Sequence, residues 1–187
     1  MKRILFLTSI MGLLFAAPVL AGIGKGNGEI GFDFGDTEFD QGLIHQDGPR
    51  LAFRGGYHLT RLFEIEGQVG ASVHYHFDAL LGRGGSRRAD TSLRTIFAEG
   101  VFNFHSKGGN VVPYVLGGVG SGTLDFPLAN ASDSGAAYII AGGSRFFFGD
   151  RDQVAFRLEV SRISLRAFDA DTNHVNATAG FTWRIGD

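Results

Sequence analysis

Charged residues recur in the middle of segments that otherwise alternate between apolar and polar side chains. Four of these residues are basic and four are acidic, so they could satisfy one another in pairs if the fold brings them together. We therefore predict an ion-pair network that fills the interior of the protein. Its predicted members are Arg54, Glu64, Glu66, Glu99, Arg145, Arg157, Glu159 and Arg184.

A second set of residues could support nucleophilic catalysis. His174 lies near the start of the last alternating segment, and Ser161 and Ser164 lie near the end of the segment before it. Catalysis needs the nucleophile and its base within about 3 Å of each other. No His-x-Ser arrangement occurs on one strand face, because Asn176 stands two residues after His174. We expect no enzymatic activity, and a lipid-modifying enzyme is the alternative.

Two further motifs could bind a metal ion or a nucleotide. His74, His76 and Asp78 share one face of a predicted strand at spacings of about 7 Å, which would supply part of a metal site. Polar groups exposed to water explain the same pattern. The G-x-G-x-x-G motif that begins at Gly26 has no strand before it and no helix after it, as a nucleotide site would need. We predict no metal and no other cofactor.

The longest alternating segment runs from Phe63 to Phe77. Its odd positions are apolar or small and its even positions are polar or glycine, which predicts a β-strand with two opposite faces. At about 3.3 Å per residue the segment spans roughly 50 Å, far more than the usual strand of about five or six residues. Strands of this length occur in soluble barrels with an apolar interior and in membrane barrels with an apolar exterior.

Seven other segments alternate in the same way, so we predict eight strands. The other seven cover residues 29–34, 51–59, 93–104, 111–123, 137–148, 154–165 and 175–185. The glycine-rich segment 111–123 does not reveal its inward face. Connections are long and polar at 35–48, 78–91, 125–135 and 169–174, and tight at 59–62, 106–110 and 149–152. Up-and-down connectivity places the two kinds at opposite ends, as in outer-membrane barrels.

Aromatic residues decide which face is inside. If the apolar face lined a soluble barrel, many Phe and Tyr side chains would share a lumen that has room only for modest ones. If that face meets lipid, aromatics near the strand ends form girdles and the charges enter the lumen. We therefore predict an all-β protein, an eight-stranded antiparallel up-and-down transmembrane β-barrel. A soluble exported barrel that binds an apolar ligand is the alternative.

The N-terminal residues and the composition agree with export. Lys2 and Arg3 precede an apolar stretch, and Val19 and Ala21 give a small-residue cleavage pattern, so residues 1–21 are predicted to be a cleaved signal peptide and residues 22–187 one barrel domain. The chain has no Cys, which excludes disulfides and a lipidated cysteine. Its net charge is -2 with dispersed basic residues, so we expect no nucleic-acid partner.

The last predicted strand carries a short motif. Thr178, Gly180, Trp183 and Ile185 follow the order polar, any, Gly, any, any, aromatic or apolar, any, aromatic or apolar. With this motif the chain resembles the small outer-membrane β-barrel family typified by the OmpA transmembrane domain and OmpX. The Pro-Tyr and Gly-rich segment 113–120 is similar to the fifth strand of that family. One departure is that two residues follow Ile185, whereas the family commonly ends on an aromatic.

The resemblance implies a place and partners for the chain. We expect a monomer in the cell outer membrane that contacts outer-membrane lipid and is inserted by the barrel assembly machinery, with the four motif residues as the assembly signal. Eight strands leave an interior just filled by side chains, so we do not expect a diffusion channel. The predicted function is non-enzymatic: a contribution to envelope structure, or to surface interaction with a ligand bound by four extracellular loops.

Overall fold

Alternating segments fold here into eight long strands. The structure is a computed structural model that describes residues 28–41, 44–77, 87–104, 110–126, 130–148, 153–168 and 170–185. Among these residues, no helix is long and apolar enough to cross a membrane. The strands are β1 (Gly28–Gln41), β2 (Ile44–His58), β3 (Phe63–Phe77), β4 (Arg87–Asn103), β5 (Val111–Phe126), β6 (Ala131–Phe148), β7 (Val154–Ala167) and β8 (Ala170–Ile185).

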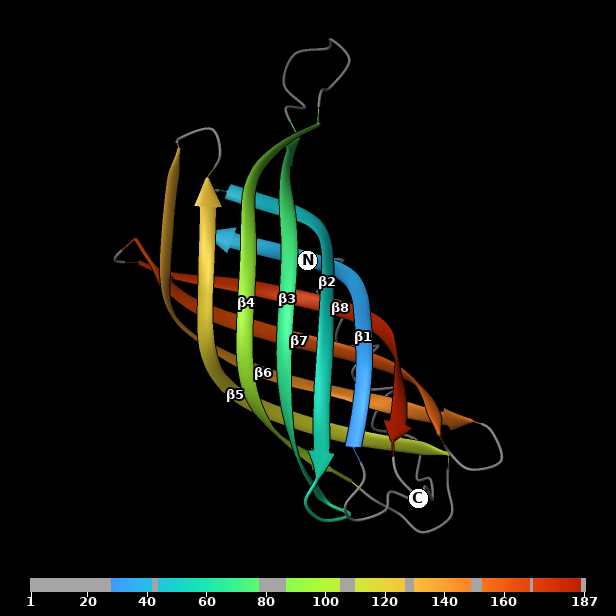
Figure 1. Cartoon of the computed structure of the whole chain (residues 1–187). Coiled ribbons are helices and arrows are strands. Elements are labelled where there is room, and N and C mark those ends of the chain that lie inside the picture. The colour runs from blue at the N-terminus through green and yellow to red at the C-terminus, as the bar shows by residue number, and fades with distance from the viewer. Residues whose placement is uncertain are drawn as a thin grey trace.

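The strands close into a barrel in which each pairs antiparallel with its neighbours in the chain, and β1 also pairs with β8 (Figure 1). Following register partners from Gly28 around the wall returns to β1 at Glu38, a shear of ten residues. Strand number and shear together fix the tilt, and outer-membrane barrels have tilts of about 35–45°. The predicted fold class is confirmed.

Several strands are longer than predicted. β1 and β2 remain paired up to Gln41 and Ile44, so most of the predicted long connection 35–48 is strand. The predicted connections 125–135 and 169–174 are wrong in the same way, because β6 begins at Ala131 and β8 at Ala170. These strand ends carry polar side chains on both faces, which removes the alternation but not the backbone pairing. β3 has the predicted bounds.

The two ends of the barrel differ in their connections. We call the end where β1 begins and β8 ends the proximal end, and the opposite end the distal end. At the proximal end β2 and β3 are joined by residues 59–62, as predicted. There the Thr60 hydroxyl accepts hydrogen bonds from the amides of Leu62 and Phe63 at 3.2 and 2.9 Å.

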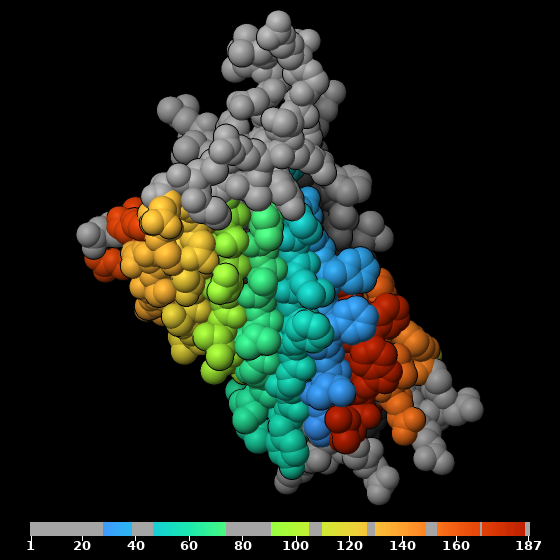
Figure 2. Space-filling model, turned by 45° about the horizontal axis from the view of Figure 1, so that its top comes forward, coloured from blue at the N-terminus to red at the C-terminus, as the bar shows by residue number. Residues whose placement is uncertain are grey.

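Apolar side chains cover the outer wall. Figure 2 shows β3, β2, β1 and β8 side by side on one face of this wall. The exposed large side chains include Phe53 on β2, Val69 on β3 and Ile140 on β6. The even positions of β3, such as Glu64 and Glu66, are buried on the inner side. The apolar face therefore points outward, which contradicts the alternative of a soluble barrel with an apolar interior.

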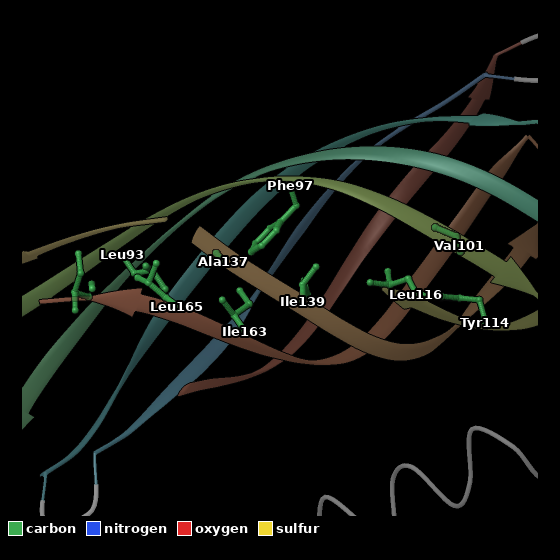
Figure 3. Packing of buried hydrophobic residues seen from close by; sticks show 11 residues of the cluster. Leu93, Phe97, Val101, Tyr114, Leu116, Ala137, Ile139, Ile163 and Leu165 are labelled. Carbon is green, nitrogen blue, oxygen red and sulfur yellow. The ribbon is translucent and has the colours of Figure 1, made fainter. Parts of the chain in front are cut away.

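The interior has an apolar part as well as a charged part. On β5 the inward side chains include Val112, Tyr114, Leu116 and Leu124, which settles the face that the sequence left open. Buried apolar side chains from β4, β5, β6 and β7 form a cluster along the lumen (Figure 3). Its members are Leu93, Phe97, Val101, Tyr114, Leu116, Leu124, Ala137, Ile139, Ile163, Leu165 and Ala167. The sequence did not reveal this cluster, because these strands carry apolar residues on both faces.

Candidate functional site

Three buried arginines organise the charged part of the lumen. Arg54 projects from β2, Arg145 from β6 and Arg157 from β7, and their relative exposures are 7%, 0% and 0%. Each occupies an inward position of an alternating strand, so strand parity alone directs it to the lumen. A guanidinium offers five donors in a fixed plane. Each arginine can therefore reach carboxylates on several strands at once.

Arg54 connects four strands. Its Nε donates to Asp33 on β1. Its Nη1 contacts Glu66 Oε2 on β3 at 3.3 Å and Glu99 Oε2 on β4 at 3.2 Å. Its Nη2 donates to Glu159 Oε1 on β7 at 2.6 Å. One side chain thus ties opposite parts of the wall together across the lumen.

Arg145 makes a similar set of contacts nearer the proximal end. Its Nη1 donates to Glu64 Oε2 at 2.8 Å and to Asn103 Oδ1 at 3.2 Å. Its Nη2 donates to Glu66 Oε1, and its Nε lies 3.3 Å from Glu29 Oε1. Glu66 is therefore shared by all three arginines, because Arg157 also contacts it through both Nη atoms.

Tyr114 completes the network. Its hydroxyl accepts a hydrogen bond from Arg157 Nε and donates one to Glu159 Oε2, both at 2.7 Å. Its ring also lies 4.5 Å from the Arg157 guanidinium carbon and 5.0 Å from that of Arg145, within the range of cation–π contacts. A Cβ at Gly143 on β6 would come within 2.5 Å of the Tyr114 hydroxyl. The glycine therefore makes the space that this tyrosine fills.

All eight predicted network residues occupy inward positions, and seven of them are buried in the lumen. Arg184 is only partly buried, and its guanidinium stacks on the ring of Phe147 at 4.5 Å. The prediction did not include the buried polar residues Glu29, Asp33, Arg50, His58 and Tyr114. The alternation of inward and outward positions along each strand could have identified Glu29, Asp33, Arg50 and His58, because each lies on the inward face of its strand. Tyr114 carries no such signal, because apolar residues occur on both faces of β5.

The residues proposed for catalysis do not come together. Ser161 and Asn176 are register partners, and Asn176 Nδ2 donates to Ser161 Oγ at 3.0 Å. Ser164 lies on the outer face and donates to Asn173 Oδ1 at 2.9 Å. His174 is buried inside, with Nε2 at 3.3 Å from the Thr172 hydroxyl. Neither serine has a hydrogen bond to His174 among the described contacts.

Other predicted motifs fall partly outside the described residues. The side chains of His74 and His76 are not among them, and neither are Asp78 and Gly26. In the C-terminal motif, Thr178 is buried on the inner side, whereas Trp183 and Ile185 are exposed on the outer wall. We propose that this exposed pair is read during barrel assembly.

Comparisons with known proteins agree with the architecture. The family model described as outer membrane protein beta-barrel domain matches residues 7–184. Neisserial surface protein A is 12% identical with a TM-score of 0.68, over 85% of this chain and 99% of its own. OprG from Pseudomonas aeruginosa is 12% identical with a TM-score of 0.58, over 90% and 100%.

A third similar structure is the N-terminal barrel domain of Pseudomonas aeruginosa OprF. It is 16% identical with a TM-score of 0.56, over 86% of this chain and 100% of its own. At these identities the likeness concerns the fold alone. A comparison with curated proteins gave no match.

The fold and the lumen define the class of this protein. A closed antiparallel barrel with an apolar exterior and a charged interior can satisfy every backbone group within lipid. The molecule is therefore an integral outer-membrane β-barrel. The match over residues 7–184 shows that the chain belongs to the outer membrane protein beta-barrel domain family, and its location is the cell outer membrane.

Proposed function

We propose that this barrel has a non-catalytic role in the envelope and that its lumen is closed to diffusion. One observation carries the proposal. Arg54, Arg145 and Arg157 bridge the lumen to carboxylates on β1, β3, β4 and β7. An eight-stranded barrel is just wide enough for its side chains to fill. Buried ions paired in this way are costly to separate.

Conductance measurements test the closed lumen. We expect the purified barrel to insert into planar bilayers without discrete, stable conductance steps. The Arg54→Ala and Arg145→Ala double variant removes two of the side chains that cross the lumen, and we expect it to give small steps or brief openings. Stable conductance of the unaltered protein would contradict the proposal. Heat-modifiable migration on gels verifies that both proteins form barrels.

The distal end is the part of this protein that we propose to face the surroundings of the cell. Polar side chains replace apolar ones on the outer wall toward this end, where Arg94, Ser134 and Arg162 are exposed. β3 and β4 remain paired to Phe77 and Arg87, and Figure 1 shows this hairpin projecting from the barrel. These strand ends and the connections between them would contact a surface ligand.

Surface labelling tests this orientation. We expect an epitope inserted after Gly84 to bind antibody on intact cells, and one inserted after Thr60 to bind only after the outer membrane is permeabilised. The two insertions lie in connections at opposite ends of the barrel, so each serves as the control for the other. The reverse pattern would place the distal end in the periplasm and overturn the proposed surface role.

A further inference from the structure

Three potential metal ligands meet near the proximal end of the lumen. Glu29 on β1, His58 on β2 and Glu64 on β3 each offer a ligand atom, and these atoms all lie within 4.8 Å of one another. His58 Nε2 is 3.4 Å from Glu29 Oε2, and His58 Nδ1 is 3.5 Å from Glu64 Oε2. All three residues are buried, with relative exposures of 4% or less. The three strands are neighbours, so the wall itself positions the set.

Polar atoms in this cluster lack hydrogen-bond partners among the described residues. Glu29 Oε1, His58 Nδ1 and Glu64 Oε1 are each buried without one. Buried polar atoms are nearly always paired, and leaving one unpaired costs about 1–3 kcal/mol in general. His58 Nε2 has a long hydrogen bond of 3.4 Å to Glu29 Oε2, whereas Nδ1 faces Glu64 Oε2 at 3.5 Å without a hydrogen bond. The cluster is arranged for a species that can bind several of these atoms at once.

The charge of the lumen also favours a cation. The buried carboxylates in the described part of the chain are Glu29, Asp33, Glu64, Glu66, Glu99 and Glu159. The buried arginines there are Arg50, Arg54, Arg145 and Arg157. Six negative and four positive groups leave a formal charge of -2 with neutral histidines. Arg184, partly buried at the inward position paired with Glu29, brings this charge to -1. The lumen is therefore net negative, which favours a bound cation.

We propose that Glu29, His58 and Glu64 bind a divalent metal ion of the Zn²⁺ type inside the barrel. One imidazole nitrogen and two carboxylate oxygens form a donor set that Zn²⁺ takes, with water as a further ligand. A tetrahedral ion with bonds of about 2.0–2.1 Å separates its ligand atoms by about 3.3–3.4 Å. The 3.4 Å between His58 Nε2 and Glu29 Oε2 is close to this value. Glu64 lies 3.5 Å from the other ring nitrogen, Nδ1, and one ion takes only one imidazole nitrogen. The three ligand atoms already lie within 4.8 Å of one another, so a movement of the Glu64 or His58 side chain would complete the set.

Neighbouring residues would orient the ligands. Arg145 Nη1 donates to Glu64 Oε2 at 2.8 Å, and Arg145 Nε is 3.3 Å from Glu29 Oε1. Asn103 Nδ2 also donates to Glu64 Oε2, at 3.5 Å. Each carboxylate has a second oxygen for the ion, and outer contacts of this kind hold ligands in place in metal sites generally. The ion would tie β1, β2 and β3 together near the proximal end.

Metal titration of the purified barrel tests the site. The protein is stripped with EDTA in detergent, titrated with Zn²⁺, and analysed for bound metal by atomic emission. We expect one ion per chain, and a rise of about 5 °C in the temperature at which the folded gel band disappears. His58→Gln and Glu64→Gln should each weaken Zn²⁺ binding at least about tenfold, because each removes a ligand.

Two controls distinguish this site from others in the chain. His174→Gln removes a histidine that is equally buried but lies on β8 toward the distal end, and it should leave Zn²⁺ affinity unchanged. The double variant His74→Asn and His76→Asn, which removes the other candidate metal motif, should also leave it unchanged. Loss of binding in the double variant alone would overturn the proposal. Unaltered binding by His58→Gln would overturn it too.

The unaltered protein provides a test that does not depend on variant folding. X-ray absorption of the Zn²⁺-loaded barrel should report one imidazole nitrogen together with oxygen donors. No saturable binding, or a zinc environment of oxygen alone, would refute the site. The closed lumen proposed above does not depend on the ion. The prediction on conductance and the prediction on metal binding can therefore each be refuted without the other.

Discussion

At the scale of single residues, the stability of the lumen depends on buried charged side chains that must keep their ion-pair partners. Glu66 contacts Arg54, Arg145 and Arg157, and Glu159 contacts Arg54, Arg157 and Tyr114. Removing one ion of a buried set leaves the others desolvated and unpaired. Buried partners therefore respond to substitution much more strongly than exposed ones do.

We predict that Arg157→Met lowers the free energy of unfolding by about 3–5 kcal/mol, because it strips a cation from Glu66 and Glu159 without changing the exterior. Urea unfolding in lipid vesicles measures the effect. Arg94→Met is the matched control: the Arg94 side chain is 75% exposed and lies 3.8 Å from Asp125, so its loss should cost less than about 1 kcal/mol. Equal effects would mean that the lumen contacts contribute no more than a surface pair.

At the scale of strands, glycine decides how closely the inner side chains can approach the wall. A Cβ at Gly143 would also lie against the carbonyl oxygen of Leu158 on the neighbouring strand, and backbone cannot move aside as a side chain can. On the outer face Gly55 has no atom within 4 Å of its Cβ position. Glycines on opposite faces of the same barrel therefore differ in what they tolerate.

We predict that Gly143→Ala destabilises the barrel by about 1–3 kcal/mol through overpacking against Tyr114 and the β7 backbone. Gly55→Ala should change stability by less than about 0.5 kcal/mol, because the added methyl group meets only lipid. Both variants keep the backbone in the extended region, so unfolding by urea compares the added methyl groups directly. A harmless Gly143→Ala would show that the lumen near Tyr114 is looser than its geometry indicates.

At the scale of the whole molecule, pairing between β1 and β8 closes the sheet into a barrel in the part of the chain that the structure describes. The pairing extends from Gly28 with Ile185 to Asp40 with Asn173, so β1 is joined to β8 over almost its whole length. The ion network and the apolar cluster then fill different parts of one lumen. This arrangement leaves the apolar wall facing lipid along its whole circumference.

We predict that the purified barrel migrates faster on gels before heating than after, because a closed sheet resists detergent until it is melted. Truncation before Ala170 deletes β8, and the shift should then disappear because β1 and β7 keep free edges. In membranes, the intact chain should resist extraction by alkaline or high-salt washing. Release by such washing would contradict its placement in the bilayer.

Alternation made most of the fold predictable. The period of two in β3 and in the cores of the other strands predicted strand positions and the sorting of charged and apolar faces. This alternation gave no signal where the two faces of a strand carry side chains of the same polarity. The polar distal ends of β1 and β2 read as a loop, and the apolar residues on both faces of β5 hid the inward position of Tyr114.

The sequence by itself therefore determined the class of fold, the number of strands and the face on which each charge lies, because strand parity is a local property. Only the tertiary structure decided which charges meet. Arg54 and Glu159 are 105 residues apart and become partners through closure and shear, which no local pattern encodes. The register of β1 with β2 and of β2 with β3 brings Glu29 beside His58 and Glu64, and it turns three separate polar residues into a candidate metal site.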